Sequence, residues 1–99
     1  MIVPESTTVR EGNTVILTCV AYGVPHPDVT WSKGGEELTN TTRMTVYSTY
    51  LEEGGVPFTQ ATLEICGVEL EDAGMYSCQG SNQNGSDTRS FNLTVAPRG

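Results

Sequence analysis

Cys19 and Cys78 bracket Trp31, the only tryptophan in the chain, and the second cysteine ends a run that begins at Asp72. This spacing is typical of a small sandwich in which a bridge between the two cysteines ties one sheet to the other. Such bridges persist in oxidising compartments and are rare in the cytosol. The spacing therefore predicts a bridged β-sandwich and an extracellular location.

The chain has 99 residues, which is the length of one domain. At this size folding removes only somewhat over ~60% of the unfolded chain's surface from water, so the core is thin. A bridge that closes a loop of 59 residues adds about 4 kcal/mol, a large share of the ~5–15 kcal/mol typical of a domain. We expect the loss of either cysteine to unfold the chain.

The chain is acidic, with 12 Asp and Glu residues against 5 Lys and Arg residues and a formal net charge of −7. Binding to phosphate backbones depends largely on Lys and Arg side chains. Nucleic acid is therefore not an expected partner. Direct contact with an anionic membrane surface is disfavoured for the same reason.

No stretch approaches the ~20 apolar residues of a membrane-spanning helix, and residues 2–5 lack the basic start and apolar run of a signal peptide. We expect a single domain over residues 1–97, with residues 98–99 beginning a linker or ending an excised piece. Met1 is then an expression start. Neighbouring domains of the same longer chain are expected partners.

Short segments with period-two alternation recur between Gly, Pro and Asn residues, and no apolar stripe of period 3.6 has a useful length. This pattern predicts an all-β fold of two antiparallel sheets. Tight turns are expected at Gly34-Gly35 and at Asn84-Gly85. The residues expected to face the core are Val15, Leu17, Cys19, Ala21, Val29, Trp31, Leu63, Ile65, Tyr76, Cys78, Gly80, Phe91, Leu93 and Val95.

The segment from Arg43 to Gln60 holds more apolar residues than one edge strand can bury. Met44 and Val46 have the spacing of a core face, and residues 52–55 have the composition of a turn. We therefore expect a long hairpin in this segment.

Several motifs together resemble one known family. They are Glu11-Gly12, Leu17-Thr18-Cys19, the turn Gly23-x-Pro25-x-Pro27, Trp31 with Lys33-Gly34-Gly35, Leu63-x-Ile65, the run Asp72 to Cys78, and Asn82-x-x-Gly85. With them the chain resembles an immunoglobulin-like domain of the intermediate set, found in adhesion molecules, receptor ectodomains and some muscle giants. The resemblance covers nearly the whole chain and implies the fold, but says little about what the domain binds.

The resemblance also implies roles for particular residues. Trp31 is expected to pack on the bridge between Cys19 and Cys78, and the Tyr76 hydroxyl to bond back to the main chain as a tyrosine corner. An ion pair between Arg43 and Asp72 is a further implication, and we expect it to control register more than stability. The stretched segment after Arg43 and one extra cysteine depart from the family pattern.

The extra cysteine is Cys66. Because Leu63 and Ile65 are expected to face the core, Cys66 is expected to face outward, on the same side as Ile16 of another strand. Three interpretations stay open: an inert reduced side chain, an intermolecular bridge in a homodimer, and a bridge to a neighbouring domain.

Three triplets have the sequence of glycan acceptors and begin at Asn40, Asn84 and Asn92. All three asparagines fall on expected turns or outward strand positions, where a glycan is tolerated. Glycans at Asn84 and Asn92 would leave the opposite sheet freer for a partner. The outward strip expected on that sheet is Ile16, Thr18, Val20, Thr45, Tyr47, Thr62 and Glu64, which is either an interface or an ordinary surface with scattered apolar residues.

Catalysis finds no support in the sequence. The single histidine, His26, lies between two prolines and is expected to be solvated. Histidine is also the residue type that can sense pH near neutrality. There is no sequence pattern of a nucleophile beside a base, a phosphate loop or a metal site, so we expect no enzyme, no cofactor and no metal. The acidic runs at residues 52–53 and 69–72 are expected to be solvated faces.

We interpret the chain as an extracellular protein-recognition or spacer module of an adhesion molecule, a receptor ectodomain or a matrix protein. The alternative is a structural intracellular module of a muscle or cytoskeletal protein, in which Cys19 and Cys78 stay thiols and no triplet is glycosylated. The acceptor triplets and the complete Cys, Trp, Cys set favour the extracellular interpretation.

Overall fold

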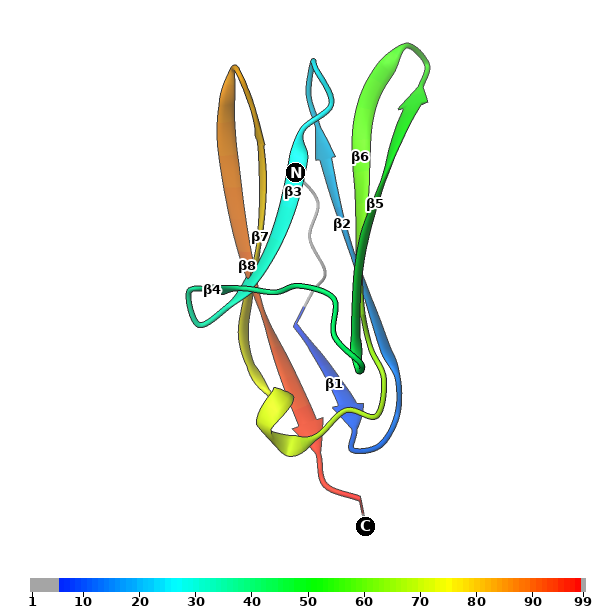
Figure 1. Ribbon diagram of the computed structural model, residues 1–99, viewed down its shortest axis with the longest axis vertical. Coiled ribbons are helices and arrows are strands. Elements are labelled where there is room, and N and C mark those ends of the chain that lie inside the picture. The colour runs from blue at the N-terminus through cyan, green and yellow to red at the C-terminus, as the bar shows by residue number, and fades with distance from the viewer. Residues whose placement is uncertain (1–5, 99) are drawn as a thin grey trace.

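Two β-sheets packed face to face make up the computed structural model, which describes residues 6–98 (Figure 1). Residues 1–5 and 99, including the expected expression start, lie outside the described residues. The elements are β1 (Thr7–Arg10), β2 (Val15–Tyr22), β3 (Asp28–Lys33), β4 (Glu36–Glu37), β5 (Met44–Glu53), β6 (Val56–Ile65), the 3₁₀ turn η1 (Leu70–Asp72), β7 (Gly74–Asn82) and β8 (Gly85–Ala96).

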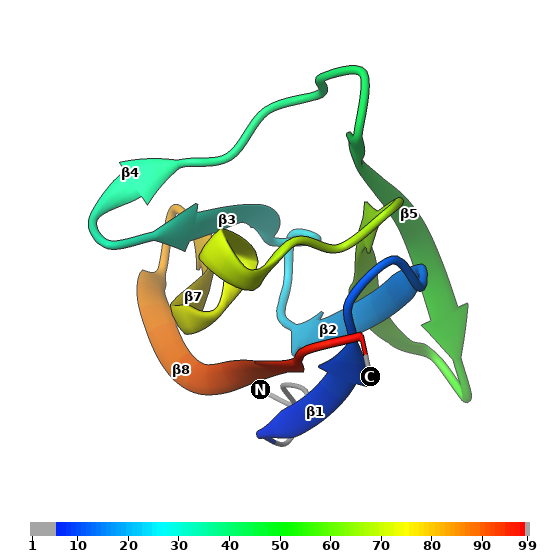
Figure 2. The ribbon, with the colours of Figure 1, turned by 90° about the horizontal axis from the view of Figure 1, so that it is seen from below.

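The described strands form a five-stranded sheet in the order β1-β8-β7-β3-β4 and a three-stranded sheet in the order β2-β6-β5. Figure 2 shows the segment between β4 and β5 crossing from one layer to the other. All pairings are antiparallel except that of β1 with β8, which is parallel and departs from the two purely antiparallel sheets that the sequence predicts. No hairpin joins β1 to β8, so nothing forces these two strands to run in opposite directions.

The core forms where the inner faces of the two sheets meet. Trp31 and Tyr76 are fully buried, and the Phe91 ring lies edge-on to Trp31 (6.0 Å between centroids) and stacked on Tyr76 (5.8 Å). The expected core positions are buried or half-buried, which confirms the period-two pattern. Within the described residues no helix is long and apolar enough to cross a membrane.

A disulfide joins the two sheets at the centre of this core. The Sγ atoms of Cys19 in β2 and Cys78 in β7 are bonded (1.92 Å), and both residues are fully buried. Trp31 is the cross-strand partner of Cys78, which places the indole beside the bridge. The bridged all-β sandwich predicted from the cysteine spacing is confirmed.

The long hairpin predicted after Arg43 is also confirmed. Strands β5 and β6 pair over ten residues each and turn at Gly54 and Gly55, whose φ angles of 58° and 80° favour glycine. The turn between β7 and β8 differs by one residue from the prediction, because Asn82 pairs with Gly85 and the loop is therefore residues 83–84.

The free energy of unfolding provides a test of the bridge. Replacing both Cys19 and Cys78 by alanine should lower it by about 4 kcal/mol, because the unfolded chain then loses a constraint that closes a long loop. Urea denaturation followed by tryptophan fluorescence measures the loss. The matched control, Cys66→Ser, should change the stability little, because Cys66 is exposed and unbridged. Equal stability of the double variant and the native protein would contradict the role given to the bridge.

Candidate functional site

The outer face of the three-stranded sheet is the surface on which side chains suited to binding gather. Alternation along β2, β6 and β5 sends every second side chain away from the core. The residues of this outer face are Ile16, Thr18, Val20 and Tyr22 in β2, Val56, Phe58, Gln60, Thr62 and Glu64 in β6, and Thr45, Tyr47, Thr49, Leu51 and Glu53 in β5.

One row across this face consists entirely of apolar and aromatic side chains. Register places Tyr22 opposite Phe58 and Phe58 opposite Leu51, and the two rings are 5.3 Å apart. Tyr22 is 50% exposed, Leu51 36% and the adjacent Val56 49%. We call these four residues the distal row, since they lie near the β5–β6 turn.

The sequence located this face but not its apolar centre. Ile16 and Tyr47 are exposed as predicted. Thr62 takes the outward position that the alternation predicts, but its side chain is buried. Thr62 lies on the central strand β6, with Thr18 of β2 on one side and Tyr47 of β5 on the other. The distal row was missed, although extending the alternation from Val20 to Tyr22 would have revealed its first member.

All charged side chains on the three strands of this face are acidic. Strands β2, β5 and β6 contain no Lys or Arg, whereas Glu52 and Glu53 lie near the turn and Glu64 lies at the other end of the face. Glu53 is exposed and Glu64 half-buried. The apolar row is therefore bordered by the carboxylates near the turn, and the same three strands carry no cation.

Contacts with the β2–β3 connection hold the distal end of the hairpin in place. His26 Nε2 donates to the Leu51 carbonyl oxygen (2.8 Å), and its ring lies 5.3 Å from that of Tyr50. The Tyr50 hydroxyl donates to Asp28 Oδ1 (2.9 Å), and this hydrogen bond raises the pKa of Tyr50. The sequence predicts a solvated histidine, whereas His26 is half-buried and bonded to a residue 25 positions away.

At the opposite end of the sandwich, η1 carries a buried carboxylate. Arg43 donates to both oxygens of Asp72 (3.0 and 3.3 Å), and the Glu69 backbone N–H donates to Asp72 Oδ2 (2.7 Å). The Tyr76 hydroxyl donates to the Asp72 carbonyl oxygen (2.5 Å) in the geometry of a tyrosine corner. The expectation that the whole acidic run is solvated is therefore wrong for Asp72, which is 4% exposed.

The pKa values of two groups reflect this arrangement. Burial raises the pKa of the Asp72 carboxyl, but the hydrogen bonds from Arg43 and from the Glu69 main chain outweigh burial, so the pKa lies below its ordinary value. Burial and the nearby Asp72 charge raise the pKa of Tyr76 to about 12.

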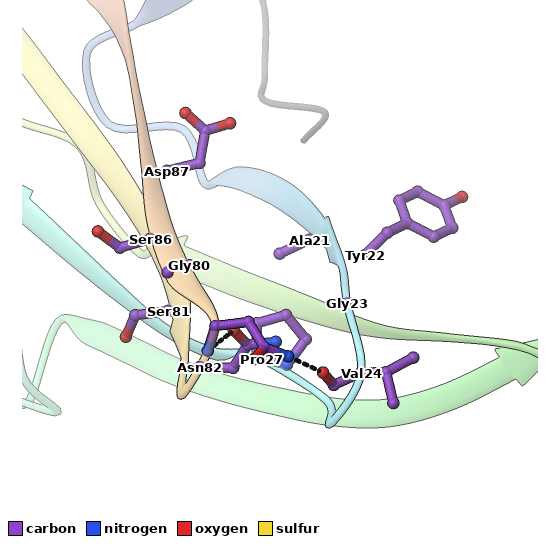
Figure 3. Close-up of a pocket in the computed structure, with 12 residues that line it drawn as sticks. Ala21, Tyr22, Gly23, Val24, Pro27, Gly80, Ser81, Asn82, Ser86 and Asp87 are labelled. Carbon is purple, nitrogen blue, oxygen red and sulfur yellow. Dashed lines mark hydrogen bonds between the residues drawn. The ribbon is translucent and has the colours of Figure 1, made fainter.

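A cleft of about 400 Å³ lies between the β2–β3 connection and the β7–β8 hairpin (Figure 3). Two amides span it: Asn82 Nδ2 donates to the Pro25 carbonyl (3.0 Å) and Asn84 Nδ2 donates to that of Val24 (2.8 Å). Asp87, the acidic residue of its lining, is bound by Arg89 (2.9 Å). These contacts stabilise the loop against the hairpin.

The three glycan-acceptor asparagines are all exposed, and none belongs to the outer face of the three-stranded sheet. Asn40 precedes β5, Asn84 lies in the β7–β8 turn, and Asn92 faces outward from β8. The Asn84 side-chain nitrogen already donates one hydrogen bond, and a glycosylated amide retains one N–H for it.

Cys66 is exposed and unbridged immediately after β6, where its thiol donates to Glu64 Oε1 (3.5 Å). Dimerisation through it stays a prediction. Among the described residues, no three His, Cys, Asp or Glu side chains gather as metal ligands would.

Comparison with known proteins agrees with this architecture. The family model of the immunoglobulin I-set domain matches residues 1–95. The chain belongs to the immunoglobulin I-set domain family. This I-set domain is 40% identical to part of the peroxidasin homolog of Mus musculus, covering 98% of this chain and 6% of that protein. It is 38% identical to part of the smooth-muscle myosin light chain kinase of Gallus gallus, covering 93% of this chain and 4% of that protein.

Among solved structures, the N-terminal eight Ig domains of the Down syndrome cell adhesion molecule contain a similar fold. The TM-score is 0.87 at 28% identity, covering 96% of this chain and 12% of that one. The I-set domain thus spans only a small share of its multidomain relatives. Of these similar proteins, one is a cell adhesion molecule by name and another is a smooth-muscle kinase by name.

Acid denaturation tests the Asp72 carboxylate. Asp72→Asn should lower the free energy of unfolding at pH 7 by about 1–3 kcal/mol, because Arg43 and the Glu69 N–H lose a charged acceptor. Since the pKa is lower in the folded state than in the unfolded chain, the carboxylate's contribution is present above about pH 4 and is lost as the pH falls through the folded pKa. Urea titrations from pH 7 to 2.5 measure it. A difference between variant and native protein that does not shrink with falling pH would contradict this role.

Alkaline denaturation tests the tyrosine corner. Tyr76→Phe should cost about 1–3 kcal/mol at pH 7, because the buried Asp72 carbonyl loses its donor while the packing against Phe91 remains. The native protein should lose stability above about pH 10, where a tyrosine in the unfolded chain ionises but Tyr76 stays neutral. Tyr47→Phe, an exposed substitution, is the control for urea titrations from pH 7 to 11. Equal losses in both variants would contradict the assignment.

Proposed function

We propose that this I-set domain is an extracellular recognition or spacer module of a longer protein and acts by binding other proteins. The observation that carries the proposal is the distal row, because its apolar and aromatic side chains are contiguous on one sheet face instead of scattered. Contiguous apolar surface on a soluble domain commonly marks an interaction site. The proposal gives the domain no catalytic step.

The disulfide supports the extracellular part of the proposal. Cys19 and Cys78 lie at bonding distance in the core, and bridges of this kind persist outside the cytosol. The exposed positions of Asn40, Asn84 and Asn92 are compatible with glycans that a secretory pathway would add. Sequence similarity to the peroxidasin homolog and structural similarity to a cell adhesion molecule point in the same direction.

The second candidate is a structural intracellular module. The 38% identity with part of smooth-muscle myosin light chain kinase favours it, since the name of that protein places the same kind of domain in muscle. In a reducing cell, Cys19 and Cys78 would have to remain thiols in the core.

Rigidity is the mechanism by which such a module binds. Pairing over ten residues in β5–β6 and the His26, Tyr50 and Asp28 contacts keep the binding face ordered before a partner arrives. Less conformational entropy is then lost on association, and more of the contact energy contributes to affinity.

Thiol counting distinguishes the two candidates. We expect protein secreted from mammalian cells to show one free thiol per chain when it is unfolded without reduction, because Cys66 alone is unbridged. Enzymatic deglycosylation of the same material should lower its mass if Asn40, Asn84 or Asn92 carries a glycan. Three free thiols, or retention of the chain inside the cell, would contradict the extracellular assignment.

A further inference from the structure

We infer that the distal row is the anchor of an interface for a basic protein partner, one whose surface presents apolar side chains flanked by Lys or Arg. This inference rests on the proposed function and specifies the site and the chemistry of the partner. It follows from three properties of the same face: its apolar row, its charge and its rigidity.

The apolar row has the composition of an interface centre. Interfaces concentrate their binding energy in a few aromatic and large apolar side chains surrounded by residues that exclude water. Tyr22 and Phe58 pack on each other at 5.3 Å, and Leu51 continues the row on the next strand. Exposed Gln60 and Thr49 border the row on the side toward the middle of the sheet, and exposed Glu53 borders it on the side of the turn.

The charge of the face selects the partner. Glu53 follows Leu51 by two positions on the same face, Glu64 lies at the far end, and Glu52 lies beside the turn. The five basic residues of the domain all lie on other segments, namely Arg10 in β1, Lys33 in β3, Arg43 before β5, Arg89 in β8 and Arg98 after it. Complementary charge accelerates association and rejects partners of like charge.

A second copy of this domain is a poor occupant of the face. Face-to-face pairing would set an acidic surface against an identical acidic surface with no cation on any of the six strands. A domain that follows Arg98 along the chain would attach at the end opposite the β5–β6 turn (Figure 1). A separate basic protein therefore fits the face better than either.

The face is also ordered by the rest of the fold. The acceptor asparagines lie on other segments, and of the three only Asn84 lines the cleft that Tyr22 also lines. His26 binds the main chain of Leu51 itself, and the Thr59 hydroxyl next to Phe58 donates to the Pro27 carbonyl (2.6 Å). Both contacts fix the row against the β2–β3 connection, which lowers the ordering cost of binding.

Selection of binders from a phage-displayed library of random cyclic peptides on the secreted, disulfide-bonded domain tests the inference. We expect selected peptides to combine Lys or Arg with Trp, Tyr, Phe or Leu. Tyr22→Ser and Leu51→Ser should each weaken their binding by about tenfold or more, as loss of an anchor does. Glu53→Lys should weaken peptide binding several-fold. Raising the salt concentration from 50 to 500 mM should also weaken peptide binding.

Met75→Ser is the matched control, because Met75 is 52% exposed on the outer face of the other sheet. It should leave peptide affinity unchanged. Circular dichroism and thermal melting establish that each variant is folded, and Leu51→Ser substitutes for Tyr22→Ser if the latter unfolds.

Several results would overturn the inference. They are peptides without basic residues, peptides that bind Tyr22→Ser and Leu51→Ser as tightly as the native domain, and a dimer in sedimentation that either substitution abolishes. A library that yields no binder to folded native domain would also overturn it. The thiol count and the secretion test contradict or support the proposed extracellular function, whereas the peptide selection tests only the inferred interface. The failure of one proposal can therefore be distinguished from the failure of the other.

Discussion

The covalent link between the two sheets is the constraint on which the rest of this I-set domain depends. Cys19 comes from the three-stranded sheet and Cys78 from the five-stranded sheet, and Trp31 lies across from Cys78 beside the bridge. In a domain of this size the apolar core is small, so a loop constraint of several kcal/mol decides whether the folded state is populated. Because the bridge and the core side chains hold the sheets together through their inner faces, the side chains on the outer faces do not have to pack in the core.

Each end of the sandwich is fastened by a different kind of interaction. At one end Arg43, Asp72 and Tyr76 form a charged and partly buried network that fixes η1 against β7. At the other end, the hydrogen bonds and ring contact that His26, Asp28 and Tyr50 make between the β2–β3 region and the β5–β6 hairpin position the distal row. The first network is sensitive to pH, whereas the second orders a surface that remains in contact with water. This division places the distal row at the opposite end of the sandwich from the Arg43, Asp72 and Tyr76 network.

Much of the fold, and less of the site, is predictable from the sequence. Alternation and the Cys, Trp, Cys spacing predict the core, the bridge and the long hairpin, since these depend on local periodicity and on one strong constraint. The parallel pairing of β1, the burial of Thr62 and the contact of His26 with Leu51 are not predictable in this way. Each depends on which segments lie side by side, and no local pattern encodes that.

The sequence by itself therefore determined the class of fold, the residues that face inward and the acidic character of the domain, because these follow from side-chain period and composition. Only the tertiary structure decided that Tyr22, Phe58 and Leu51, from three separate strands, form one row. Register between strands aligns them, and register is set by the simultaneous burial of the opposite face. The apolar row is thus a consequence of how the core packs.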